Sequence, residues 1–139
     1  MNKDKVVDKL NAILEHELAG VVRYTHYSFM VFGHNRIPIV KWLRDQGSES
    51  LLHAGEVGEH ITALGGHPSL KISKLLETQK HSINDILTES LTHEQTQIKL
   101  YRDLLDEVAD DSIFIEEFAR KMIAEEEMHV AEVQKMLRK

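Results

Sequence analysis

Residues that interrupt a helix are scarce in this chain of 139 residues and fall mostly in two places. The chain has two prolines and seven glycines, and most of them lie in the stretches 33–38 and 65–68. Glycine and proline are the strongest interrupters of regular backbone, so the long segments between these places are predicted to be helices. Apolar residues in those segments recur every three or four positions, the period of a helix with one buried face.

Four helices are predicted, spanning about residues 3–32, 38–64, 82–108 and 112 to the end. The links inside the first pair and inside the second pair are short, so each pair is expected to form an antiparallel hairpin. The connection of about fifteen residues between the pairs is long enough to cross the length of a bundle. The predicted fold class is an all-α four-helix bundle, one domain over residues 1–139, with one long crossover and no fifth helix.

Composition excludes several kinds of site and partner. There is no cysteine, so any metal must be held by imidazole, carboxylate or main-chain oxygen, and no disulfide or thiol nucleophile is available. A formal net charge of −6 argues against a nucleic-acid-binding surface. No apolar run approaches the length needed for a membrane span or a secretion signal. We therefore expect a cytoplasmic protein without nucleic-acid or membrane partners.

Two of the predicted helices carry a glutamate at a position that the apolar pattern assigns to the core. Glu17 lies on the inward stripe of the first helix, and Glu94 lies on that of the third. Each acid precedes a tyrosine, Tyr24 or Tyr101, by seven residues on the same face. Since residues on one stripe face the same way, both carboxylates are predicted to point inward with a phenol two turns further on.

The last helix carries an acid and a histidine on its inward stripe. Glu126 and His129 lie one turn apart on that stripe, whereas Glu125 and Glu127 fall to either side. We expect these two flanking acids to be solvated, as charged runs on helices usually are. The pair Glu126 and His129 is the candidate ligand pair.

The second helix has an inward histidine, His53, that corresponds to His129 of the last helix. Three residues before it stands Ser50 in place of an acid, and the nearest carboxylate is Glu49, four residues before. We expect Glu49 to take the role of the missing acid, with a π-bulge near residues 48–52 bringing it into register.

Alone, each of these polar residues has an ordinary structural explanation, but together they favour a metal site. Glu17 and Glu94 are 77 positions apart and His53 and His129 are 76 apart, so the second hairpin repeats the polar pattern of the first. Several acids facing one cavity repel one another without a cation. Carboxylates with imidazoles and no thiolate are the ligands of di-iron or di-manganese sites in bundle cores. The candidate ligands are Glu17, Glu49, His53, Glu94, Glu126 and His129. His16 and His93 are expected at the surface or around this site.

The sequence resembles the bacterioferritin branch of the ferritin-like di-iron carboxylate superfamily over most of its length. The resemblance is clearest in LNAILEHELAGVVRYTHYSFMVFG, HAGEVGEHITALGGHPSL and EFARKMIAEEEMHVAEV. It implies a centre of two irons per chain, beside which Tyr24 would lie. It also implies oxidation of Fe(II) with oxygen or hydrogen peroxide, and in many members storage of the ferric product in a hollow shell. The di-iron ligands implied by the resemblance are Glu17, His53, Glu94, Glu126 and His129.

Three departures limit what the resemblance implies. Ser50 stands where the family has an acid that bridges both metals, so either Glu49 substitutes or the second metal binds weakly. Leu51 stands where the family has a haem-ligating methionine, and leucine cannot bind iron, so no haem is expected. The sequence after the fourth helix has no short fifth helix that would help to close a shell. We therefore expect a homo-oligomer, at least a dimer, rather than a 24-subunit cage.

Three functions stay open at this point. The first is a non-haem di-iron ferroxidase, an oxidoreductase acting on Fe(II), with Tyr24 or Tyr101 as a nearby one-electron donor. The second is a peroxide reductase similar to rubrerythrins, which would need an external electron donor because the chain has no cysteine for a rubredoxin domain. The third is a non-enzymatic bundle whose metal site has decayed, for which Ser50 is the best support. Manganese or zinc in place of iron is also open.

Overall fold

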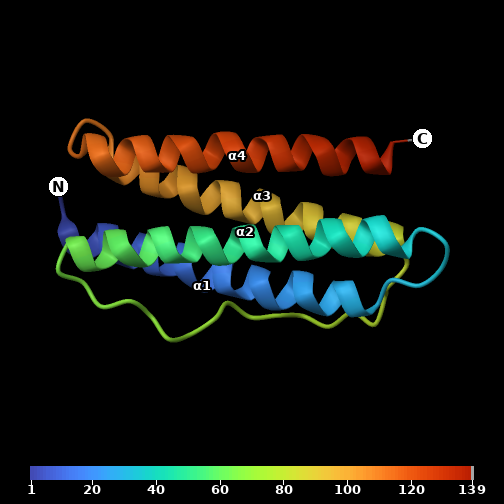
Figure 1. Ribbon diagram of the computed structural model, residues 1–139. Helices are drawn as coiled ribbons and strands as arrows, with labels where there is room; N and C mark the ends of the chain where they lie inside the picture. The colour runs from blue at the N-terminus through green and yellow to red at the C-terminus, as the bar shows by residue number, and fades with distance from the viewer. Residues whose placement is uncertain (139) are drawn as a thin grey trace.

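The computed structural model of the protein describes residues 1–138 and consists of four long α-helices (Figure 1). The helices are α1 (Lys3–Phe29), α2 (Arg36–Ala63), α3 (Ile83–Val108) and α4 (Ile113–Leu137). No strand occurs in the described part of the chain. The predicted all-α four-helix fold is therefore confirmed. None of these helices is long and apolar enough to cross a membrane.

The helices form two antiparallel hairpins joined by a long crossover. α1 packs along α2, α3 packs along α4, and α1 also contacts α3. The crossover, residues 64–82, runs the length of the bundle beside α1 and so brings the chain back to the end at which α3 begins (Figure 1). Several contacts fasten it to α1. Among them, the Asn11 side chain binds the backbone of His67 and Ser69, and the amide of Ser73 donates to the carbonyl of Glu15.

Side-chain caps fix three of the helix starts where the sequence pattern puts them. The side chains of Asn2, Ser82 and Ser112 each accept a hydrogen bond from a backbone N–H in the first turn of α1, α3 and α4. Such caps satisfy N–H groups that have no partner within the helix. The predicted start of the third helix near residue 82 and of the fourth near residue 112 agree with the structure.

The turn between α1 and α2 differs from the prediction. α1 ends at Phe29, three residues before the predicted end, and α2 begins at Arg36, two residues before Pro38. The Arg36 guanidinium supports the early end, because it donates to the carbonyl of Ser28 in the last turn of α1 (3.2 Å) and to that of Val31 just beyond the helix (2.7 Å). A side chain that reaches back across a turn leaves no periodic signal in the sequence.

The apolar core consists of two clusters with a polar layer between them. One cluster gathers around Leu10, Val57 and Tyr101, and the other around Tyr24, Leu43 and Ile86. Along α1, α2 and α3, the inward-facing acids and histidines lie between these two clusters. The bundle therefore surrounds its polar layer with apolar side chains on both sides, which limits access of water.

Gly20 is a position at which α1 packs closely against α2 and α3. A Cβ atom at this position would lie 2.9 Å from Nε2 of His93 and 3.0 Å from Oγ of Ser50. The His93 ring cannot retreat easily, since it is buried and stacked on His16 with 4.0 Å between ring centroids.

We predict that Gly20→Ala destabilises the protein by about 1–3 kcal/mol, because the added methyl overpacks this contact. The control is Gly58→Ala on α2, where a Cβ would meet nothing within 4 Å. There the lower entropy of the unfolded chain should stabilise the helix by about 0.5–1 kcal/mol. Urea denaturation of both variants measures the two changes, and equal effects would contradict the packing described for Gly20.

Candidate metal centre

Three carboxylates from three helices are buried in the polar layer of the bundle. The exposed fractions are 1% for Glu17 of α1, 5% for Glu94 of α3 and 3% for Glu126 of α4. Their inward positions follow from the helical period, which puts each on the stripe shared with core residues. A buried carboxylate is strongly unfavourable unless it is protonated, paired or bound to a cation. The partners of these acids therefore decide what the site can do.

His53 of α2 lies at the middle of these acids, with carboxylates at both ring nitrogens. Its Nδ1 is 3.0 Å from Oε2 of Glu17 and 3.6 Å from Oε1 of Glu126. Its Nε2 is 3.0 Å from Oε2 of Glu125 and 3.7 Å from Oε1 of Glu49. One imidazole thus joins acids from α1, α2 and α4.

His129 and Glu94 complete a second group on the other side of Glu126. The Nδ1 of His129 lies 3.5 Å from Oε2 of Glu126, and its Nε2 lies 3.2 Å from Oε2 of Glu49. Donor atoms of Glu94, Glu126 and His129 all lie within 4.8 Å of one another, and the same holds for Glu17, His53 and Glu126. Glu126 belongs to both groups, with Oε1 toward His53 and Oε2 toward His129. The arrangement can hold two cations that share one carboxylate.

The acids and imidazoles shift one another's pKa. Burial raises the pKa of Glu17 to about 7, although His53 opposes this change. Burial disfavours a charged His53, but the carboxylates of Glu126 and Glu17 outweigh it and raise the pKa of this imidazole to about 11. Burial by itself would raise the pKa of Glu126, but His129 and His53 together hold that pKa below its usual value. At neutral pH the centre therefore keeps a proton on His53, which offsets part of the buried negative charge.

The donor atoms fit a bound cation better than a closed hydrogen-bond network. Oε2 of Glu17, Nδ1 of His53 and Oε2 of Glu126 are buried and have no hydrogen-bond partner within residues 1–138. The 3.0 Å approach of His53 to Glu17 is thus a close contact without hydrogen-bond geometry. Buried polar atoms are rarely left unsatisfied. Imidazole and carboxylate donors without thiolate suit iron, manganese or zinc.

The two tyrosines named from the sequence differ in their contacts. The Tyr24 hydroxyl donates a hydrogen bond to Oε1 of Glu94 and so orients one of the candidate ligands. The Tyr101 hydroxyl is buried in the apolar cluster and has no hydrogen-bond partner among the described residues. Burial raises the pKa of both phenols well above the usual value, so both are protonated at neutral pH. Of the two tyrosines, Tyr24 alone donates a hydrogen bond to a candidate ligand within residues 1–138.

On α2, the side chain that lies with the acids and histidines of the centre is that of Glu49 and not that of Ser50. Glu49 contacts His53 and His129, whereas Ser50 lies against α1 beside Gly20 and His93. The predicted π-bulge is wrong, because α2 is a continuous α-helix through residues 48–52. No π-bulge is needed, because residues four apart on a helix are neighbours and Glu49 reaches His53 directly.

The expectation that Glu125 is solvated is wrong. Its side chain is only 32% exposed and its Oε2 lies 3.0 Å from Nε2 of His53. Glu125 precedes His129 by four residues and therefore shares its flank of α4, a signal that the single core stripe does not include. Glu127, by contrast, is exposed and pairs with Arg102 at 2.7 Å, as expected for a solvated charge.

A second buried polar group lies next to the centre, between α1 and α3. The rings of His16 and His93 stack at 4.0 Å between centroids, and His16 is hydrogen-bonded to the side chain of Gln97. Burial lowers the pKa of His93 to about 2 and also lowers that of His16, so both are neutral. Of the two expectations for these histidines, surface or surroundings of the site, the second agrees with the structure.

Comparison with solved structures finds the same architecture in several proteins. Ferritin-like, diiron-carboxylate proteins from Bacillus anthracis superpose with a TM-score of 0.92 at 23% identity, covering 98% of this chain and 97% of that one. The bacterioferritin of Rhodobacter capsulatus, described with a metal-free dinuclear site and haem iron, gives 0.86 at 26% identity over 96% and 84%. The dodecameric thioferritin of Bacteroides fragilis, a bacterioferritin-related protein, gives 0.88 at 21% identity over 99% and 86%.

No curated protein sequence matches this one at a significant level. A protein family does match the sequence, and it agrees with the structural comparison. The ferritin-like domain family matches residues 7–139, a range that includes all of α2, α3 and α4 and nearly all of α1. Because the match covers almost the whole chain and the structure has the corresponding fold, the chain belongs to the ferritin-like domain family.

Proposed function

We propose that this protein is a non-haem di-iron oxidoreductase of ferroxidase type, which oxidises Fe(II) with oxygen or hydrogen peroxide in iron storage or detoxification. One observation carries the proposal: two buried groups of metal-binding side chains share Glu126 and draw on all four helices. Membership of the ferritin-like domain family and similarity to diiron-carboxylate proteins support it.

In this proposal each metal has its own ligand set. Glu17 and His53 would hold one cation and Glu94 and His129 the other, and Glu126, which belongs to both groups, would be shared between them. Glu49 lies near both histidines and compensates for Ser50. Iron, bound as two ions per chain, supplies the redox chemistry, and manganese or zinc would compete for the same oxygen and nitrogen donors.

The side chains of this protein have three tasks around the metals. The carboxylates would balance the positive charge of the metals, and Glu17, whose pKa is raised to about 7, can gain or lose a proton near neutral pH when that charge changes. Tyr24 fixes the orientation of Glu94 through its hydrogen bond. The two apolar clusters keep water away from the reacting groups.

Glu49 and Glu125 provide an access path for Fe(II) as substrate. Both side chains are 32% exposed, and both contact the Nε2 side of His53, whereas Glu17 and Glu126 contact its Nδ1 side. They therefore connect the buried acids to solvent. A pair of partly exposed acids attracts cations and concentrates them there.

We further propose a homo-oligomer, at least a dimer, without haem. Leu51 and Leu52 are exposed on α2 and offer an apolar surface for a second copy. Leu51 has no atom that can bind haem iron, so the purified protein is expected to show no Soret absorption. Size-exclusion chromatography with light scattering measures the assembly.

We predict that Glu126→Gln reduces the rate of Fe(II) oxidation at least about tenfold, because it removes the shared ligand of both metals. The matched control is Glu127→Gln, which alters the neighbouring acid that pairs with Arg102 on the surface. Anaerobic loading with Fe(II), followed by oxygen or peroxide and near-ultraviolet absorbance, measures the rate. If the wild type and Glu126→Gln both oxidise Fe(II) no faster than it oxidises in buffer, the site has decayed and the protein is a non-enzymatic bundle. Equal rates above that background would rule out Glu126 as the shared ligand.

We also predict that affinity for Fe(II) at the centre rises at least about tenfold per pH unit between pH 6 and 8, because His53 and, below about pH 7, Glu17 must give up a proton to the metal. The pKa of His53 is raised to about 11, so its proton is present throughout this range and a cation must displace it. A higher pH therefore favours metal binding, because fewer protons compete with the cation for His53. Anaerobic calorimetry in buffers of different ionisation enthalpy counts the released protons. A pH-independent affinity with no proton release would rule out His53 as a ligand.

A further inference from the structure

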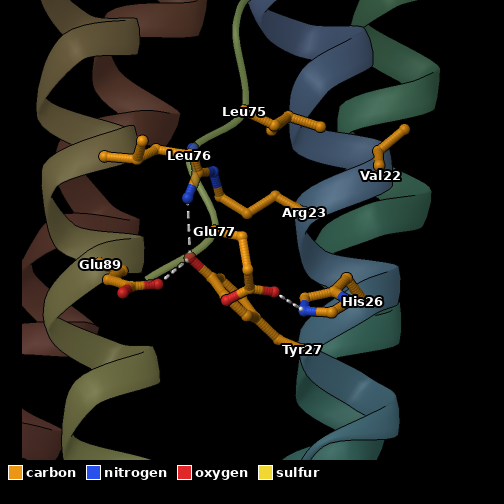
Figure 2. A pocket seen from close by; sticks show the side chains of 8 residues that line it. All are labelled: Val22, Arg23, His26, Tyr27, Leu75, Leu76, Glu77 and Glu89. Carbon is orange, nitrogen blue, oxygen red and sulfur yellow. Dashed lines mark hydrogen bonds and ion pairs between the residues drawn. The ribbon is translucent and has the colours of Figure 1, made fainter. Parts of the chain in front are cut away.

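A separate group of metal-binding side chains lies away from the bundle centre, where the crossover meets α1. It consists of His26 on α1 and of Glu77 and His81 in the crossover. The Nε2 of His26 lies 2.8 Å from Oε2 of Glu77, and the Nε2 of His81 lies 3.4 Å from Oε1 of the same carboxylate. Figure 2 shows the Glu77 side chain extending from the crossover to His26. None of these three residues belongs to the centre between the helices.

We propose that His26, Glu77 and His81 bind one divalent transition-metal ion, best matched by Zn²⁺, which clamps the crossover to α1. Two imidazoles and one carboxylate form a known three-ligand set for zinc, in which water takes the fourth position. With metal–donor bonds of about 2.0–2.1 Å, tetrahedral donors lie roughly 3.4 Å apart. One donor atom from each residue already lies within 4.8 Å of the others. Small side-chain rotations are enough to close the site.

The backbone of the crossover holds Glu77 and His81 in place for this role. These residues are four apart but lie outside any helix. Gln79 between them has a φ of 60°, a left-handed conformation that is uncommon for a residue other than glycine. Its amide donates to Oε1 of Glu77 at 2.7 Å. The turn therefore both orients the carboxylate and brings His81 back to it.

Neighbouring contacts hold the crossover on its other side without using the proposed ligands. Thr78 donates a hydrogen bond to Glu89 of α3, which also accepts one from Tyr27 at 2.7 Å. Arg23 donates to the Tyr27 hydroxyl at 2.8 Å, and Figure 2 shows this chain of contacts running from Arg23 to Glu89. Arg23, a cationic side chain that lines the same cavity as His26 and Glu77, is thus engaged with Tyr27. The single carboxylate of Glu77 is left to balance a bound cation.

The site is open to metal from solution. His26 and Glu77 are partly exposed, and His81 is mostly covered. A cavity of about 220 Å³ lies beside His26 and Glu77, with Val22, Leu75 and Leu76 among its walls (Figure 2). It leaves room for a water molecule on the cation.

The alternative is that the two imidazoles merely donate hydrogen bonds to Glu77. Zn²⁺ titration by calorimetry separates the two cases, using the full-length wild type, His81→Gln and Glu77→Gln. The control is His34→Gln, which changes an exposed histidine outside the cluster. We expect the wild type and His34→Gln to bind one more Zn²⁺ than His81→Gln and Glu77→Gln. Affinity for that ion should fall at least about tenfold in both cluster variants. Since zinc can also bind the bundle centre, the difference between variants reports on the cluster.

Hydrogen exchange gives an independent readout of the clamp. The amide of Gln79 is held by Glu77, so Zn²⁺ should slow its exchange in the wild type and in His34→Gln but not in His81→Gln. Fe(II) oxidation should be unchanged in His81→Gln, so failure of this proposal is distinguishable from failure of the proposed function. Equal zinc stoichiometry and equal affinity in the wild type and both cluster variants would overturn the site. So would exchange at Gln79 that does not respond to Zn²⁺ in the wild type.

Discussion

The structure depends on how the bundle tolerates Glu126, a carboxylate buried between four helices. Its two oxygens face His53 and His129, and it lies in the same polar layer as Glu17 and Glu94. Burying such charges without compensation costs several kcal/mol for each ion. The protonated His53 supplies part of the compensation, and bound cations would supply the rest. Apolar clusters on both sides of this layer pack the helices together and limit contact of the acids with water.

Helical periodicity was sufficient to predict the deepest part of the site. Glu17, Glu94 and Glu126 interrupt apolar stripes, and a stripe residue in a long helix has one direction in which to point. The four-helix fold followed from the same periodicity together with the positions of glycine and proline. Periodicity is less reliable for residues at the edge of the stripe. It places Glu125 in solvent, because the stripe is narrower than the surface that a neighbouring helix covers.

Features that depend on irregular backbone did not follow from the sequence. The end of α1 depends on Arg36 reaching back to two carbonyls. The cluster of His26, Glu77 and His81 depends on a left-handed Gln79 in a segment without periodicity. No spacing rule brings a crossover residue to a chosen turn of α1. The cluster of His26, Glu77 and His81 is therefore apparent only in the structure. The sequence and its family resemblance already indicate the centre around Glu126.

The most direct test of the central claim is anomalous X-ray diffraction at the iron absorption edge from crystals of this protein loaded anaerobically with Fe(II). We predict two anomalous peaks per chain inside the bundle, one on each side of the Glu126 carboxylate, within bonding distance of Glu17 and His53 on one side and of Glu94 and His129 on the other. Absence of density among these residues in iron-loaded crystals would contradict the di-iron account.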